Sequence, residues 1–197
     1  MSDPASTAAP GHGFWLALPP GWVSLDVDPS TSTSTIRRMV AAAAEADETV
    51  AANREELEGM LIDAARDCAT SGVLYCAAYF EPFEDMAVQA SLAVAVHAAV
   101  EGTDFGRMAT ELADGEGGRT IEVVDLDAGG AVKRSGRRRT RFPGTEEPLE
   151  LLTHQFFIPV PGTTDLLAVV AFASPTLGLE ADLVALFDAI ADSFAFT

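Results

Sequence analysis

The chain has 197 residues, of which 48% are hydrophobic and 21% are charged, a composition that predicts one folded domain and argues against general disorder. Its 30 acidic and 12 basic side chains give a formal net charge of −18, which repels phosphate backbones and anionic membrane surfaces. We therefore expect no nucleic-acid partner and no membrane insertion, because no apolar run approaches the ~20 residues that span a bilayer.

The N-terminal segment, residues 1–12, is rich in alanine, serine, proline and glycine and shows no periodicity. This pattern predicts a disordered tail, followed by a single domain over residues 13–197. The segment has no basic region, no long apolar region and no lipid-accepting cysteine, so we expect neither a secretory signal nor a lipid anchor. The only cysteines, Cys68 and Cys76, do not form a disulfide framework and are expected to be buried thiols in a reducing, cytoplasmic compartment.

The first half of the domain is predicted to contain two strands and then two helices. An apolar run at 14–18 and an alternating run at 22–27 flank Pro19-Pro20-Gly21, which indicates two short strands around a turn. The hydroxyl-rich segment 30–35 is interpreted as a loop that caps a helix beginning near residue 36. A second helical stripe runs from residue 50 to 68, with Asp47 as its cap.

The second half is dominated by period-two alternation, which is typical of strands with one buried face. Strands are predicted at 73–80, 86–98, 120–126, around Gly129-Gly130, at 149–160 and at 166–173, with a short helix at 104–113. The last two strands are joined by Pro161-Gly162-Thr163-Thr164 and should form an antiparallel hairpin. An amphipathic helix over 179–194 closes the chain. The predicted fold class is therefore α+β, a mostly antiparallel sheet flanked by helices in an α/β/α sandwich.

Two segments carry a family resemblance. The opening Leu18-Pro19-Pro20-Gly21-Trp22, and the terminal helix from Leu186 to Phe194 with the two strands before it, resemble the PsbP-like superfamily. The resemblance implies an α/β/α sandwich in a family of mostly non-catalytic accessory subunits, transport cofactors, lipoproteins and secretion chaperones. Eleven arginines against one lysine, with abundant alanine, resemble the usage of an actinobacterial genome.

Half of the basic residues lie in one stretch, which is the candidate partner-binding site: Lys133, Arg134, Arg137, Arg138, Arg139 and Arg141. Arginine offers bidentate, permanently charged donors for carboxylates or phosphates on a partner. Strand alternation is expected to place Arg137, Arg139 and Arg141 on one face. The alternative interpretation is a solvated hairpin that neutralises the protein's own acidic surface.

The sequence contains no recognisable set of catalytic or metal-binding residues. The histidines His12, His97 and His154 are far apart, and no cysteine or histidine pair has the spacing of a zinc site. Nucleophile elbow, Walker and dinucleotide-binding motifs are absent. We therefore predict no cofactor and no metal, and interpret His97 and His154 as hydrogen-bonded, partly buried side chains.

The functional prediction is a non-catalytic accessory or chaperone-like domain that binds another protein, through the basic stretch or the small-residue face of 89–99. The alternative is a ligand-binding module or enzyme with a pocket between sheet and helices, marked by polar groups converging near His97 or His154. A group of aromatic residues in the first half is interpreted as core, with the lining of a pocket or partner groove as the alternative: Trp15, Trp22, Tyr75, Tyr79, Phe80 and Phe83. A homodimer formed through a sheet edge is compatible with either function.

Overall fold

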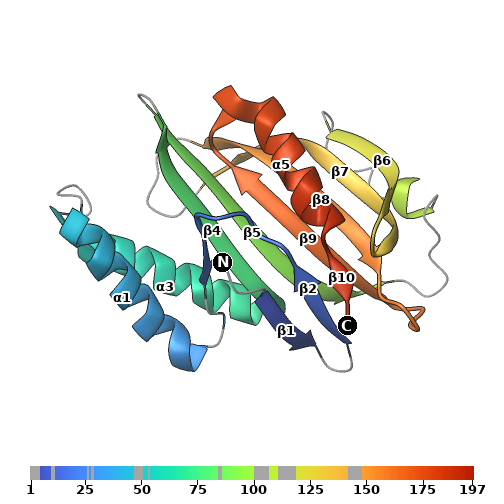
Figure 1. The fold of residues 1–197 in the computed structure, drawn as a ribbon, viewed down its shortest axis with the longest axis horizontal. Helices are drawn as coiled ribbons and strands as arrows, with labels where there is room; N and C mark the ends of the chain where they lie inside the picture. The colour runs from blue at the N-terminus through green and yellow to red at the C-terminus, as the bar shows by residue number, and fades with distance from the viewer. Residues whose placement is uncertain are drawn as a thin grey trace.

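The computed structural model describes residues 5–9, 12–25, 27, 29–46, 51–52, 54–83, 86–99, 107–110, 119–141 and 148–197. A seven-stranded antiparallel sheet forms the centre of the molecule, in the order β3-β4-β5-β9-β8-β7-β6 (Figure 1). Its strands are β3 (Trp22–Leu25), β4 (Val73–Phe83), β5 (Met86–Ala98), β6 (Arg119–Leu126), β7 (Gly129–Thr140), β8 (Leu149–Pro159) and β9 (Leu166–Ser174). The sheet and its helices confirm the predicted α+β class with a mostly antiparallel sheet.

A second, three-stranded sheet joins the two ends of the chain. It contains β1 (Ala5–Ala9), β2 (His12–Leu16) and the two-residue β10 (Ala195–Phe196), in the order β1-β2-β10. The Thr197 amide donates to the Gly13 carbonyl at 2.9 Å, and the Ser193 hydroxyl accepts from the Ala17 amide at 2.9 Å. These bonds hold β2 against the end of the terminal helix, where Figure 1 shows both lying on the same face of the large sheet.

Helix α5 (Glu180–Asp192) covers that face, because its apolar stripe faces the sheet. Leu183, Phe187, Ile190 and Ala191 are buried, whereas Asp182 and Asp192 in the same helix are exposed. The core beneath it draws on alternate residues of β8 and β9, among them Phe156, Ile158, Val170 and Phe172. A short 3₁₀ turn, Leu177–Leu179, leads into the helix.

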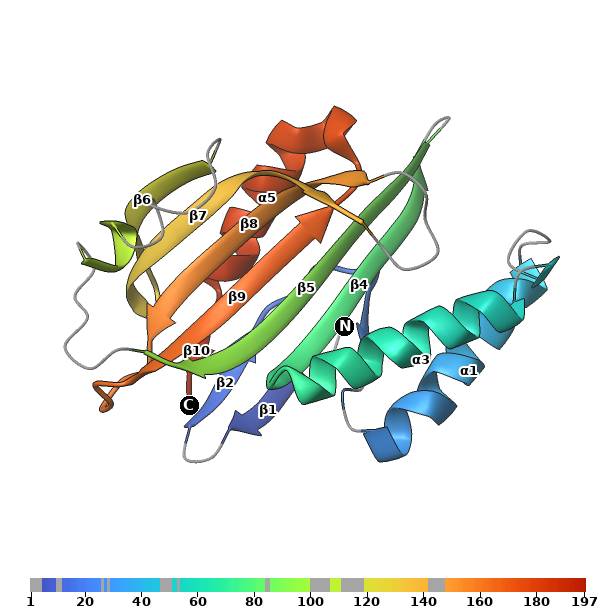
Figure 2. The same cartoon turned by 180° about the vertical axis from the view of Figure 1, so that it is seen from behind.

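Helices α1 (Pro29–Ala46) and α3 (Arg54–Thr70) form a hairpin that projects beyond the β4 side of the sheet (Figure 2). They enclose a small core of their own, made by Ile36, Val40 and Ala65 with Leu61 and Ile62 packed against it. The helical hairpin therefore depends mainly on contacts between its own two helices, with fewer contacts from α3 to β4 and from α1 to β3.

Two local predictions differ from the structure, and a third is confirmed. Segment 30–35 is not a loop: helix α1 begins at Pro29, whose fixed φ suits a first helical position, and Ser32 is buried one turn before Ile36. Residues 5–9, expected in a disordered tail, form β1 through backbone pairing with β2. The runs 14–18 and 22–27 contain strands, as predicted, and these two strands belong to different sheets. The domain boundary at residue 13 stays a prediction.

The remaining elements follow the alternation closely. Strands β4 to β9 lie where they were predicted, and β8 and β9 form the expected antiparallel hairpin. Residues 107–110 are helical, within the short helix predicted at 104–113, while the rest of that helix and the proposed cap Asp47 lie outside the described residues. Strand β10 was not predicted, because two residues are too few to show a period.

Candidate functional site

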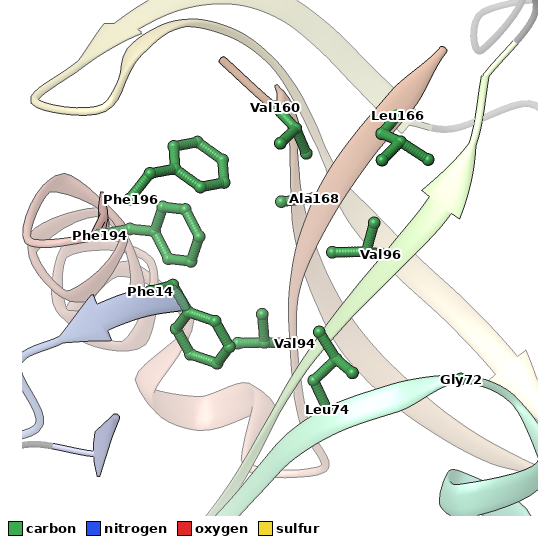
Figure 3. A pocket seen from close by; sticks show the side chains of 10 residues that line it. All are labelled: Phe14, Gly72, Leu74, Val94, Val96, Val160, Leu166, Ala168, Phe194 and Phe196. Atoms are coloured by element: carbon green, nitrogen blue, oxygen red, sulfur yellow. The ribbon is translucent and has the colours of Figure 1, made fainter. Parts of the chain in front are cut away.

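A pocket of about 360 Å³ lies between the large sheet and the small one. One wall is the sheet face formed by β5, β9 and the end of β8, and the other is formed by β2 and β10. Figure 3 shows the side chains of both walls pointing toward one another. The lining residues are Phe14, Gly72, Leu74, Val94, Val96, Val160, Leu166, Ala168, Phe194 and Phe196.

The aliphatic wall follows from strand register. Val96 pairs with Ala168, and Val94 pairs with Val170, so these side chains share the face on which α5 and β2 lie. At position 168 only a methyl group projects from the sheet, between larger neighbours. The small side chain leaves room above the sheet at the point where α5 has already ended.

A β-bulge adds Leu74 to this wall. Val73 pairs with Ala95 while Tyr75 pairs with the adjacent Val94, so Leu74 has no partner on β5 and the register shifts at that point. A bulge re-aims a side chain by inserting one extra residue, and Leu74 here points into the pocket beside the backbone of Gly72 (Figure 3). Gly72 has φ of 74°, a left-handed conformation that favours glycine, in the turn between α3 and β4.

The opposite wall is aromatic. The rings of Phe14 and Phe194 are stacked with centroids 5.5 Å apart, and Phe196 meets Phe194 edge to face at 5.1 Å. Phe14 and Phe194 are buried and Phe196 is half-buried. The three rings come from both ends of the chain, and their mutual contacts hold the wall in place.

The chemistry of the pocket is apolar throughout. None of its ten lining residues has a titratable, nucleophilic or metal-binding side chain. The volume falls within the range of roughly 300–1,000 Å³ that small-molecule sites occupy. Such a lining favours hydrocarbon and offers no partner to a buried polar group of a ligand. Across the described part of the chain, no three histidine, cysteine, aspartate or glutamate side chains group as a metal site.

The basic stretch lies on β7, and the structure divides it between the two faces of the sheet. Lys133 and Arg137 face α5: Lys133 Nζ lies 3.0 Å from a Glu122 oxygen, and Arg137 Nη2 lies 2.5 Å from Glu180 Oε2. Arg134, on the other face, donates to Gln155 Oε1 from both Nε and Nη2, at 3.0 and 2.6 Å, and lies over the ring of Phe157.

The remaining arginines of the stretch, Arg138, Arg139 and Arg141, are exposed. Alternation places Arg139 on the face of Arg137, as predicted, whereas Arg138 lies on the opposite face. Arg141 follows the end of the strand. Lys133, Arg134 and Arg137 thus contact other side chains of the protein itself. Arg138, Arg139 and Arg141 form the exposed half of the stretch, which a partner could contact.

His154 is fully buried and lies beneath α5. Its Nε2 is 2.8 Å from Asp188 Oδ1, while its Nδ1 has no partner among the described residues. Burial lowers the pKa of His154, and the hydrogen bond to Asp188 offsets that lowering only in part. Lys133 Nζ lies 3.7 Å from the same Asp188 oxygen. Burial opposes the charge on Lys133, but Glu122 and Asp188 raise its pKa overall.

The polar groups expected to mark a pocket do not converge on it. His154 faces α5, and His97 follows Val96 on β5 but alternates to the opposite face of the sheet, so neither lines this pocket. Among the aromatic residues, Tyr75 is in the core as predicted, but Trp15 and Phe80 are exposed. Sequence reasoning missed the pocket because its residues were identified only as core, and Phe14, Phe194 and Phe196 lie at opposite ends of the chain.

Comparison with known proteins gives a likeness in fold, but no match in sequence. No family model and no curated protein matches the sequence. Among solved structures, the chain is similar to LpqN, described as involved in cell envelope biogenesis of Mycobacterium tuberculosis, with a TM-score of 0.55 and 10% identity. The match covers 99% of this chain and 90% of the LpqN chain. The likeness shows a shared α+β fold, and at this identity it transfers no residue roles.

Proposed function

We propose that the chain is a non-catalytic accessory protein that binds an apolar small molecule in the pocket between its two sheets. The observation that carries the proposal is the lining of the pocket, which consists of aliphatic and aromatic side chains and the backbone of one glycine. A pocket of this composition can bind and shield hydrocarbon, but it holds no acid, base or nucleophile with which to act on it.

The ligand class follows from the same lining. A hydrocarbon chain or ring fits a site without polar side chains, and a polar head group of the ligand has to stay at the pocket mouth, in water. LpqN, the structural neighbour, is described as involved in cell envelope biogenesis, and an envelope component with a hydrocarbon part is a ligand consistent with this pocket. We also propose that the chain belongs to the PsbP-like superfamily and comes from an actinobacterium.

The location remains part of the proposal. Within the described residues, no helix has the length and apolar character needed to cross a membrane. We keep the cytoplasm as the proposed compartment, while the neighbour's described role makes the cell envelope the alternative to test by fractionation.

The pocket is tested by filling it. Val96 is half-buried, so Val96→Trp should occupy the pocket while leaving the buried layer beneath it in place. Val123, on the edge strand β6, is 59% exposed, and Val123→Trp is the matched control. We expect the wild type and the control to bind 1-anilinonaphthalene-8-sulfonate, with displacement by dodecanol, and the Val96 variant to bind the dye at least tenfold more weakly.

The thermal shift with dodecanol is the second readout of the proposed ligand site. Dodecanol at saturating concentration should raise the unfolding midpoint of the wild type and of the control, because a ligand that binds only the folded state stabilises it. Equal dye binding and an equal thermal shift in the Val96 variant would contradict the proposal. Near-ultraviolet circular dichroism checks that each variant keeps its packed core, so that dye binding does not report a loosened fold.

A protein-interaction role is the second candidate, and the exposed arginines favour it. The sequence ranked this role first, and the side chains of Arg138, Arg139 and Arg141 extend into solvent on a protein whose net charge is −18. Guanidinium groups in that setting suit carboxylates or phosphates of a partner. A homodimer through the edge strands β3 or β6 is compatible with both candidates and is tested by solution mass.

The matched experiment compares two triple variants in an affinity pull-down. Arg138/Arg139/Arg141→Ala removes the exposed half of the basic stretch, whereas Arg37/Arg38/Arg66→Ala removes three exposed arginines from the helical hairpin. We expect a partner that is lost from the first variant and kept by the second, with binding weakened by salt. Equal retention by both variants would exclude β7 as the binding surface.

A further inference from the structure

The two cysteines, separated by eight positions in sequence, meet in space. Cys68 lies in the last turn of α3, Cys76 lies on β4, and their Sγ atoms are 3.8 Å apart within a thiol–thiol hydrogen bond. Both residues are half-buried, whereas the sequence predicted buried thiols.

The local chain geometry produces this approach. Helix α3 ends where the Ser71 amide donates to the carbonyls of Asp67 and Cys68, at 3.0 and 3.1 Å. Gly72, with φ of 74°, then reverses the chain into β4. Cys76 pairs with Ala93 and alternates with Tyr75, which places it on the sheet face opposite the pocket, where the end of α3 packs.

We propose that Cys68 and Cys76 form an intramolecular disulfide, an oxidative modification that joins the end of α3 to the large sheet. The sulfur atoms have to approach from 3.8 Å to the ~2.0 Å of a disulfide bond, a movement within reach of side-chain rotation. The oxidant is a low-molecular-weight disulfide. One thiolate attacks a sulfur of the oxidant and releases one thiol, and the second cysteine then displaces the other half as a second thiol.

The surroundings of the two thiols assign the order of attack. The hydrogen bond with Cys76 lowers the pKa of Cys68 to about 7, so a large fraction of it is thiolate near neutral pH. That same hydrogen bond, together with burial, raises the pKa of Cys76. Cys68 is therefore the attacking sulfur, and Cys76 resolves the mixed disulfide.

The disulfide between Cys68 and Cys76 would also restrict part of the pocket wall. The segment that it closes, residues 68–76, contains Gly72 and Leu74, which belong to the pocket wall. Oxidation would fix the turn that carries them and connect the helical hairpin covalently to the sheet. This consequence rests on the proposed function, whereas the disulfide itself stands on the geometry of the thiols alone.

The test uses the full chain, reduced and then incubated with oxidised glutathione. Thiols are counted by maleimide labelling and intact mass. We expect both thiols to be lost together, with a loss of the mass of two hydrogen atoms, in a monomer that dithiothreitol restores. Oxidation should also raise the unfolding midpoint, because a covalent link reduces the freedom of the unfolded chain.

Serine variants supply the controls. Cys76→Ser should stop at a glutathione adduct on Cys68, and the double variant Cys68→Ser/Cys76→Ser should show no shift in unfolding midpoint on oxidation. Two free thiols, a stable adduct or a disulfide-linked dimer in the oxidised wild type would overturn the proposal. None of these readouts uses the pocket, so failure of dye binding leaves this result intact.

Discussion

At the scale of single residues, His154 shows how burial and a hydrogen bond oppose each other. The ring is fully buried, against Phe156 and Phe187, and its charged form is disfavoured there. The charged groups that approach it from the packed elements are Asp188 on α5, Lys133 on β7 and Glu122 on β6. Asp188 and Glu122 favour the imidazolium and Lys133 disfavours it, and the pKa remains lowered overall.

This lowered pKa predicts a loss of stability in mild acid. Below about pH 6.5 the unfolded chain takes up a proton at residue 154 that the folded protein resists. The free energy of unfolding should therefore fall by up to about 1.4 kcal/mol per pH unit as the pH decreases, until the folded pKa is reached. Urea unfolding of the wild type between about pH 7.5 and pH 5.5 measures this slope.

The control for this prediction is His154→Gln, which removes the titrating group and keeps an amide near Asp188. The variant should lose the histidine part of the slope, while carboxylates elsewhere contribute equally to both proteins. His97 is present in both proteins and therefore does not account for a difference between them. Equal slopes in the two proteins would show that His154 has the same proton affinity in both states.

At the scale of elements, α5 packs on the sheet through a buried stripe that includes Phe187. Its ring stacks on Phe172 of β9 with centroids 4.6 Å apart and an interplanar angle of 15°, and it has no exposed surface. The helix begins without a side-chain cap hydrogen bond, although Glu180 and Asp182 favour its positive N-terminal end. Packing, and not capping, therefore decides the position of this helix.

Phe187→Ala should thus lower the free energy of unfolding by about 3–5 kcal/mol, because it removes a buried ring and leaves a cavity. Val123→Ala, on the exposed surface of β6, should change it by no more than about 0.5 kcal/mol. Chemical denaturation of both variants at one pH measures the difference. A small effect at position 187 would mean that α5 can repack or detach without loss of the fold.

At the scale of the whole molecule, the pocket exists because the two ends of the chain meet. Strand β2 pairs with β10 through Trp15 with Ala195 and Phe14 with Phe196, and this pairing brings the aromatic wall over the sheet. The net charge of −18 keeps the surface strongly acidic around this apolar interior. The proposed ligand site and the proposed disulfide at Cys68 therefore both depend on the assembled fold.

The sequence by itself determined the class of the fold and most of its elements. Period-two alternation located β5 and the β8–β9 hairpin, and a 3.6-residue stripe located α5, because both signals arise from which side of a single segment is buried. The same local logic failed at segment 30–35, where Ser32 continues the buried stripe of α1 although hydroxyl residues are typical of loops and caps. A buried serine gives no hydrophobic signal, so the start of α1 could not be predicted.

Only the tertiary structure decided the pocket, the thiol pair and the division of the basic stretch. The pocket depends on the bulge at Leu74 and on the meeting of Phe14 with Phe194, and register and long-range contact are not encoded in any one window of sequence. The approach of Cys68 to Cys76 depends on how a helix end folds back on a strand. For β7, alternation predicted which residues share a face, but only packing against α5 decided that Arg137 would pair with Glu180 and that Arg138 would stay exposed.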